Sequence, residues 1–481
     1  MTIEAITVIW IALPLFLGFS IYLMPSRSRI LAAIIAIASL TCGLFQIFAL
    51  TPITFTLTGS FGVTLALDPL SGYFVLTNAI VTMAVILYSW ASDKTAFFFA
   101  QVAFLHGSMN AVFICADFMS LYVALEVVGI AAFLLIAYPR SDRAIWLGLR
   151  YLFISNTAML FYLMGVVQIY RATESFAFTG IEAAPPAAIA LILLGLLSKG
   201  GLFVSGLWLP QTHAGAETAV SAMLSGIVVK AGIFPLVRYS LLLDDVLPML
   251  QLFSVASAVL GTSCAILEKD TKRMLAWSTL SQMGFILVAP ATAGVYALGH
   301  GLAKAALFLT AGNLPSRQFS VLKQQSVPRA LWMVAVIAGL SICGFPLVVG
   351  FGAKALALKA VEGWVSIALN VAAVGTVVAF AKFIFLPTAR VSQSLSTGFW
   401  AAIALLLGVL VSASALTPDA YTLFNLLKAL AVVLAGWLLH SLLSPRLATE
   451  RLTLSASPER LDNITGAMIL MLLFLFWWIV P

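Results

Sequence analysis

The sequence predicts an all-α polytopic membrane protein with about 14 to 16 transmembrane helices, including two inverted five-helix repeats that each contain a broken helix. Of the 481 residues, 62% are apolar and only 9% are charged, whereas soluble domains carry about 25% charged residues. Nearly the whole chain divides into apolar stretches of about 20 residues, the length that crosses a bilayer as a helix. This leaves no room for a soluble catalytic domain, and we expect no catalytic residues.

The expected spans follow one another with short polar loops between them. The first span lacks the basic leader and the small-residue cleavage pattern of a signal peptide, so we expect it to be retained. Between the second and third spans, Thr alternates with apolar residues over 51–68 around Gly59 and Gly62, which predicts a hairpin outside the bilayer. The expected spans are 3–24, 30–50, 70–91, 96–114, 116–137, 145–169, 187–209, 215–242, 248–267, 274–292, 294–315, 329–361, 362–387, 398–418, 422–443 and 463–480.

Helix breakers stand in the middle of the seventh and twelfth expected spans. These are Lys199-Gly200-Gly201 followed by Gly206 and Pro210, and Gly344-Phe345-Pro346 followed by Gly350, Gly352 and Lys354. Broken helices are tolerated in membranes where they line a cavity, and a matched pair indicates two structural repeats. We therefore divide the chain into N-terminal helices at 1–95, a first repeat at 96–242, a second repeat at 243–390 and C-terminal helices at 391–481.

The positions of Lys and Arg indicate how the chain is oriented. Alternate loops hold most of them, as the positive-inside rule predicts, so we expect both termini to face away from the cytoplasm. We expect the membrane to be a bacterial inner membrane. The net charge of +7 then marks topology rather than a nucleic-acid partner. The loops expected on the cytoplasmic side hold Arg27, Arg29, Lys94, Arg140, Arg143, Lys272, Arg273, Arg317, Lys323, Arg390, Arg446 and Arg451.

The four cysteines are Cys42, Cys115, Cys264 and Cys343, and they lie far apart within or at the ends of apolar runs. They form no CxxC pair and have no histidine at metal-ligand spacing. We therefore expect no disulfide, no metal site and no cofactor.

Ionisable side chains inside the expected spans are the strongest indication of function. Each costs about 2.5 to 3.5 kcal/mol at the bilayer centre, and the six together would cost over about 15 kcal/mol if they faced lipid. They are Glu126, Lys199, Lys230, Lys304, Lys354 and Lys382. We expect them to face a protein interior, where each needs a partner, water or a function.

Lysine suits a proton relay because burial weakens its hold on a proton and a nearby carboxylate restores that hold. A pair between Glu126 and Lys199 would retain the lysine proton. Separation of the pair would release the proton toward Lys230. The buried series therefore predicts a proton transporter.

Structural readings of the same residues stay open. Glu126 and Lys199 would in that case be a buried ion pair that fixes helix packing, and Lys304 would extend its ammonium group toward the interface. Arg150 is placed either to neutralise Glu126 or to anchor its helix at the interface. Lys382 stands near the cytoplasmic end of its span.

Around these residues the sequence resembles a known family, the proton-conducting membrane subunits shared by complex I, membrane-bound hydrogenases and Mrp-type sodium/proton antiporters. The resemblance covers about 96–390. It rests on LLSKGGLFVSGLWLPQTHAGAETAVSAMLSGIVVKAGIFPLVR at 196–238, KRMLAWSTLSQMGFIL at 272–287, HGLAKAALFL at 300–309 and GFPLVVGFGAKALAL at 344–358. Among the branches, the chain is most similar to the D subunit of Mrp antiporters because of its length and the pattern VSAMLSG…VVKAG.

The resemblance implies roles for single residues. The family's proton-conducting positions, taken from its fifth helix to its twelfth, match Glu126, Lys199, Lys230, Lys304 and Lys354, and His300 matches the accessory member of its helix-eleven pair with Lys304. Two departures stand out. Ser225 occupies a position where the family often has His, one turn before the relay lysine, and Glu217 and Ala219 occupy positions where it has Pro. Ser225 is still able to hold a water, whereas Glu217 adds a carboxylate to which the resemblance gives no role.

The resemblance implies a membrane subunit of a multisubunit monovalent cation/proton antiporter, with sodium as the cation and other membrane subunits as partners. In a first alternative, the same lysines pump protons in an NADH- or ferredoxin-dependent quinone oxidoreductase, and the chain is then part of an enzyme. In a second, the chain is a structural subunit whose lysines no longer conduct. The residues do not separate antiport from the first alternative, because no redox centre is expected in this subunit in either complex.

Overall fold

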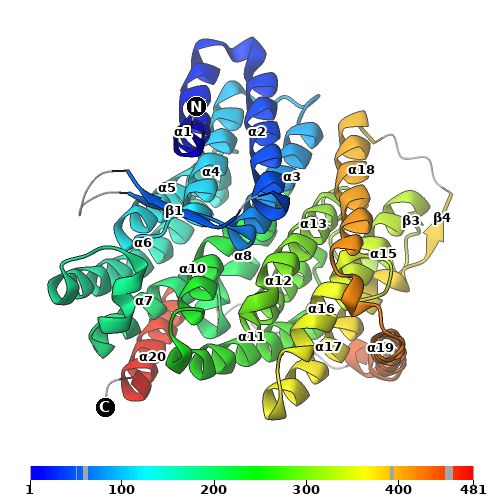
Figure 1. Ribbon diagram of the computed structural model, residues 1–481. Helices are drawn as coiled ribbons and strands as arrows, with labels where there is room; N and C mark the ends of the chain where they lie inside the picture. The colour runs from blue at the N-terminus through cyan, green and yellow to red at the C-terminus, as the bar shows by residue number, and fades with distance from the viewer. Residues whose placement is uncertain (1, 50, 58–62, 391–394, 450–458, 480–481) are drawn as a thin grey trace.

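The computed structural model describes residues 2–49, 51–57, 63–390, 395–449 and 459–479, which form a bundle of α-helices (Figure 1). Within these residues, 13 helices are long and apolar enough to cross a membrane. The number is up to 14 if α12 (Thr271–Leu287) and α13 (Ala293–Ala311), which are bent by 111° at the break between them, count as one further span. The prediction of an all-α polytopic membrane protein is confirmed.

The N-terminal part consists of α1 (Ile3–Leu23), α2 (Ser28–Phe48), β1 (Ile53–Thr56), β2 (Thr64–Leu67) and α3 (Pro69–Tyr88). The two strands pair antiparallel, which confirms the predicted hairpin. Gly59 and Gly62, expected near its turn, lie outside the described residues. The Thr64 amide donates to the Asp117 carboxylate at 2.9 Å. The hairpin is therefore fastened to the turn that precedes the fifth helix.

The predicted first repeat contains α4 (Ala96–Ile114), α5 (Phe118–Ile136), α6 (Asp142–Thr173), α7 (Pro186–Lys199), α8 (Leu209–Gly215), α9 (Thr218–Met223) and α10 (Lys230–Ser240). The predicted break lies between α7 and α8, where Gly201 and Phe203 adopt positive φ angles of 65° and 50°. A left-handed residue ends an α-helix, and glycine adopts that conformation without steric strain. A π-helical turn at Leu224–Val228 joins α9 to α10. Lys230 therefore follows a widened turn, a feature frequent at functional sites.

The predicted second repeat contains α12 and α13 together with α11 (Leu247–Leu267), the short α14 (Phe319–Leu322), α15 (Arg329–Cys343), α16 (Val349–Lys359) and α17 (Gly363–Ile384). Its break separates α15 from α16, where Gly344 and Leu347 have φ angles of 82° and 78°. Both predicted breaks are thus confirmed at the glycines that the sequence indicated. The division into two inverted repeats stays a prediction.

The C-terminal part consists of α18 (Thr397–Ser412), α19 (Leu423–Thr449) and α20 (Leu461–Ile479). Helix α18 packs against α3 and α13, and α19 packs against α17. Helix α20 packs instead against α7, on another side of the bundle from α19 (Figure 1). Arg451, expected in the loop between these last two helices, lies outside the described residues.

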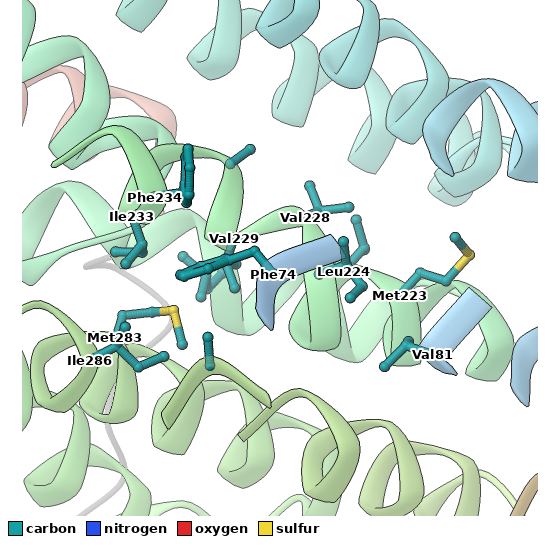
Figure 2. Close-up of a cluster of buried hydrophobic side chains, with 14 of the residues drawn as sticks. Phe74, Val81, Met223, Leu224, Val228, Val229, Ile233, Phe234, Met283 and Ile286 are labelled. Atoms are coloured by element: carbon teal, nitrogen blue, oxygen red, sulfur yellow. The ribbon is translucent and has the colours of Figure 1, made fainter. Parts of the chain in front are cut away.

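The most deeply buried of the described spans is Thr218–Ser240, in which an apolar stretch of 18 residues is buried throughout. Figure 2 shows apolar side chains of α3, α9, α10, α12 and the π-helical turn gathered around it, among them Phe74, Val81, Met223, Val229, Phe234, Met283 and Ile286. Helices in a bilayer associate through close packing, because lipid is as apolar as these side chains. The packing therefore keeps lipid away from Lys230, which lies in the middle of this span.

Candidate functional site

Lys199 is the last residue of α7 and is buried at the first break. Its ammonium group donates to the Leu125 carbonyl at 3.0 Å and to the Ser155 hydroxyl at 2.5 Å. Glu126 follows Leu125 on α5, is half-buried and interacts electrostatically with Lys199. It takes part in none of the salt bridges between described residues. The expected Glu126–Lys199 pair is thus an interaction without direct contact, and the lysine is held by neutral oxygens.

Lys199 lines a small cavity of about 10 Å³, which is about the room that one water molecule needs. Ser155 and Trp208 form part of its lining. The lining also includes Tyr151 and Ser198, whose hydroxyls have no hydrogen-bond partner among the described residues. The surroundings of Lys199 are therefore polar enough to hold a water against it.

Lys230 is fully buried at the start of α10. Its ammonium group donates to the Gly226 carbonyl of the π-helical turn and lies 3.2 Å from Nδ1 of His300. The helix that carries His300 approaches the π-helical turn closely because Gly301 has no side chain. A Cβ on Gly301 would lie 3.0 Å from the Gly226 carbonyl oxygen. The contact brings together two residues that stand on either side of the predicted boundary between the repeats.

Ser225 belongs to a second hydrogen-bonded chain. Its hydroxyl lies 2.7 Å from that of Thr279 on α12, and the Thr279 hydroxyl donates to the Leu275 carbonyl at 2.9 Å. The Lys304 ammonium group donates to the same carbonyl at 2.8 Å. Ser225, which stands where the family often has His, is therefore linked to Lys304 through one hydroxyl and one shared carbonyl.

His300 and Lys304 lie one turn apart on α13 and are both buried, but they have different partners. His300 contacts Lys230. Lys304 faces the Leu275 carbonyl and lies over the Phe380 ring at 5.5 Å. The pair expected from the resemblance, His300 and Lys304, therefore makes no mutual hydrogen bond, and each residue has its own partner.

Lys354 stands on α16, just beyond the second break. Its ammonium group donates at 2.8 Å to the carbonyl of Ile342, in the last turn of α15. A helix that ends leaves the carbonyls of its last turn without helical partners, so the break supplies this acceptor. Lys354 also lines a half-open cavity of about 390 Å³ that includes the exposed Lys359 and Asp419. Among the buried lysines of the site, it is the one beside this larger opening.

Arg150 is buried on α6, where its guanidinium group donates to the Glu459 carbonyl at 2.5 Å. The Glu459 carboxylate in turn accepts from Arg273, which also pairs with Glu268 at 2.9 Å. Arg150 therefore belongs to a cluster that joins α6, α12 and Glu459, which lies two residues before α20. Its hydrogen-bond partner is Glu459 and not Glu126.

Glu217 and Lys382 have structural partners. Glu217, at the start of α9, pairs with Lys94 at 2.5 Å. Lys382 donates to the carbonyls of Ala265, Ile266 and Glu268 at 2.7, 3.1 and 2.8 Å. These carbonyls lie at the end of α11, so Lys382 caps that helix. These contacts favour structural roles for both residues, and none of them tests an accessory role in transport.

No motif in the sequence marks His213, yet it is fully buried on α8, close beyond the first break. Its ring packs between those of Trp208 and Phe308, and it interacts electrostatically with Lys304. The feature of the sequence that points to His213 is its position between the first break and the deeply buried span Thr218–Ser240. Among the described residues, no group of three or more His, Cys, Asp or Glu side chains is placed to hold a metal ion.

The model of a transmembrane family of NADH:quinone oxidoreductases and Mrp antiporters matches residues 115–379. The chain is 30% identical over 348 residues to NADH-quinone oxidoreductase subunit N of Desulforudis audaxviator, which is 64% of this chain and 69% of that protein. It is 26% identical over 328 residues to the D subunit of the Na(+)/H(+) antiporter of Alkalihalophilus pseudofirmus, which is 61% of this chain and 66% of that protein. Across eight such relatives it covers between 44% and 69% of the relative's length.

A solved structure of the Mrp complex from Dietzia sp. DQ12-45-1b contains a chain of the same fold, with a TM-score of 0.79. That match covers 97% of this chain and 60% of the other at 21% identity. The similarity to that chain therefore concerns the fold.

Proposed function

Because the chain belongs to the NADH:quinone oxidoreductase/Mrp antiporter transmembrane family, we propose that it is the proton-conducting membrane subunit of a multisubunit monovalent cation/proton antiporter, with sodium as the cation. The observation that carries this proposal is the contact of the fully buried Lys230 with His300. Helix α10, which begins at Lys230, packs against α7, which ends at Lys199, and His300 shares a small cavity with Ile342, whose carbonyl accepts from Lys354. The pattern VSAMLSG…VVKAG and the similarity to the D subunit of a Na(+)/H(+) antiporter support antiport.

Protons enter at Glu126 and Lys199. Glu126 is the half-buried member of the series, so it is reachable from outside the packed core. The proton crosses the bundle through Lys230 and the α13 residues His300 and Lys304, which have separate partners, and it leaves from Lys354. The 390 Å³ cavity that contains Lys354, Lys359 and Asp419 supplies the outlet.

Neutral oxygens make this series suitable for passing charge. The ammonium groups of Lys199, Lys230, Lys304 and Lys354 each donate to a backbone carbonyl. A carboxylate in direct contact would hold a proton firmly, whereas a carbonyl stabilises the ammonium group less. Like charges repel, so an ammonium group on one lysine disfavours an ammonium group on the next. A proton that binds one lysine thereby promotes release of the proton from its neighbour.

The second candidate is a redox-driven pump. The 30% identity to an NADH-quinone oxidoreductase subunit N favours it. The chain would then be the proton-pumping subunit of an NADH- or ferredoxin-dependent quinone oxidoreductase and would use the same lysines.

The partners in either complex are further membrane subunits. We place the complex in a bacterial inner membrane, with both termini of this chain on the outer side. We expect the purified chain alone to be inactive in liposomes, because coupling resides in the assembled complex. Cation-dependent proton movement by the isolated chain would contradict this expectation.

Everted vesicles from an antiporter-deficient host that expresses the whole gene cluster distinguish the candidates. If the proposal holds, sodium addition moves protons in wild type but not in Lys199→Ala or Glu126→Ala. If sodium has no effect and oxidation of NADH or ferredoxin acidifies the vesicles, the redox pump replaces the antiporter. If the variants match an active wild type, the site assignment is wrong in either complex.

A further inference from the structure

A second cavity of about 10 Å³ lies between α12, α13, α15 and α16, and it has about the room that one water molecule needs. Four polar side chains line it: Gln282, Tyr296, His300 and Ser341. All four are nine-tenths or more buried. The cavity touches His300 on one side and the end of α15 on the other.

Three polar atoms of this lining have no hydrogen-bond partner among the described residues: Nε2 of Gln282, Nε2 of His300 and Oγ of Ser341. Buried polar groups in proteins are nearly always satisfied, by protein or by ordered water. Three unsatisfied atoms around one cavity of this size therefore point to one shared water.

The donor and acceptor pattern is also consistent with a water. The Tyr296 hydroxyl donates to Oε1 of Gln282 at 2.8 Å, so the amide presents its NH₂ group as a donor. A lysine ammonium group has only donors, so Nδ1 of His300 accepts from Lys230 and Nε2 carries the ring proton. A water accepts from Gln282 and His300 and donates to the Ser341 hydroxyl, which uses both of its acceptor sites.

The cavity lies between two lysines of the relay. His300 contacts Lys230 through its other ring nitrogen. Ser341 precedes Ile342, the residue whose carbonyl accepts from Lys354. Lys304 is directed elsewhere, toward the Leu275 carbonyl. His300 and Ser341 therefore lie on a path for protons from Lys230 to Lys354, and Lys304 lies beside this path.

We propose that a water bound by Gln282, His300 and Ser341 carries protons from His300 to the break before Lys354. This inference rests on the proposed proton-conducting function and assigns its step between Lys230 and Lys354. Ser341 takes part in the transfer, and Gln282 and Tyr296 are positioning residues. Lys304 influences the step through its charge.

The step conserves atoms and charge. Lys230 gives a proton to Nδ1 of His300 as Nε2 gives its own proton to the water. The water gives one of its protons to the Ser341 hydroxyl, and the hydroxyl releases its own proton toward neutral Lys354. Lys230 loses one proton and Lys354 gains one. The imidazole ends as its other neutral tautomer, and rotation of the ring restores the starting form.

The test uses Ser341→Thr and Ser341→Val in the assembled complex. The two new side chains have nearly the same shape, but only threonine keeps the hydroxyl. We expect Ser341→Thr to move protons within about twofold of wild type, and Ser341→Val to move them about tenfold more slowly or worse, per assembled complex, because it leaves the water without an acceptor. Equal rates for both variants would overturn the proposal.

A second readout does not depend on transport. Cryo-electron microscopy of the wild-type complex, at a resolution that shows ordered waters, should reveal one density within hydrogen-bond distance of Gln282, His300 and Ser341. A dry cavity would overturn the inference even if the complex transports protons. A wild-type complex that moves no protons under either driving force, with the water present, would instead remove the proposed function and its relay step while leaving the water site.

Discussion

The Nζ atom of Lys230, in the middle of the most deeply buried of the described spans, lies 3.2 Å from Nδ1 of His300. The two residues are 70 positions apart in the chain. The contact links residues of the two predicted repeats. On one side α10 packs against α7, which ends at Lys199, and on the other His300 lines a small cavity with Ile342, the acceptor of Lys354. The geometry of this series, and of the contacts that hold it, determines what each substitution below should do.

Lys382 is expected to support structure rather than transport. Its ammonium group donates to three carbonyls at the end of α11. Lys382→Met leaves these carbonyls without their donor, so we expect a loss of about 1 to 3 kcal/mol in stability and an unchanged pH profile of proton movement. Thermal unfolding of the purified complex and transport per assembled complex measure the two effects. Loss of transport in a complex of wild-type stability would assign Lys382 to the relay.

Glu217 and Lys94 are expected to stabilise the fold as a pair. Their charged atoms lie 2.5 Å apart, and Lys94 also lies over the Tyr138 ring at 4.5 Å. Both side chains keep some contact with solvent, so we expect Lys94→Met and Glu217→Gln each to cost about 1 kcal/mol or less. The double variant should cost less than the sum, as a double-mutant cycle measures. Additive costs would show that the pair contributes nothing.

Asp68 gives the fold a dependence on pH. Burial raises the pKa of its carboxyl, but hydrogen bonds from Arg238 and Ser71 and the charge of Arg238 outweigh burial, so the pKa lies below its ordinary value. Such a group stabilises the fold fully above its unfolded pKa of about 3.9, and this stabilisation is lost as the pH falls through the folded pKa.

We therefore expect Asp68→Asn to lower the unfolding temperature of the complex near neutral pH. Its difference from wild type should shrink on acidification below about pH 4. Thermal unfolding at a series of pH values checks this. A difference that persists unchanged into strong acid would show that the charge of Asp68 does not stabilise the fold.

Gly344 and Gly363 form a matched pair for testing the second break. Both have positive φ, 82° and 57°, so alanine at either position strains the backbone by about 1 to 2 kcal/mol. A Cβ on Gly344 would lie 3.0 Å from Cδ of Lys354, whereas one on Gly363 would meet no atom within 4 Å. We expect both variants to lose stability but only Gly344→Ala to slow proton movement. Equal rates of proton movement in the two variants would show that the space at Gly344 does not position Lys354 for transport.

The sequence predicts the break positions well, because Gly201 and Gly344 are read directly as left-handed residues that end a helix. It also identifies the buried lysines, since a charged residue within an apolar span is recognised from the order of residues alone. It does not predict which groups meet. His300 contacts Lys230 rather than Lys304 because α13 packs against the π-helical turn at Leu224–Val228, a matter of tertiary packing.

The small polar residues of the site are the least predictable part. Ser341 and Gln282 resemble many other polar residues in spans, and only the cavity between their helices distinguishes them. The cap that Lys382 forms and the cluster of Arg150 with Glu459 likewise depend on segments over 100 residues apart. Such contacts have no local signature.

Proton movement by Lys230→Met is the most direct test of the relay. Methionine keeps the length and apolar stem of lysine but cannot carry a proton. In everted vesicles driven by whichever source drives wild type, we predict that Lys230→Met moves no protons per assembled complex. Lys382→Met, the same substitution at a half-buried lysine of another span, should move them at close to the wild-type rate. Transport by Lys230→Met at the rate of Lys382→Met would contradict a relay through Lys230 and His300.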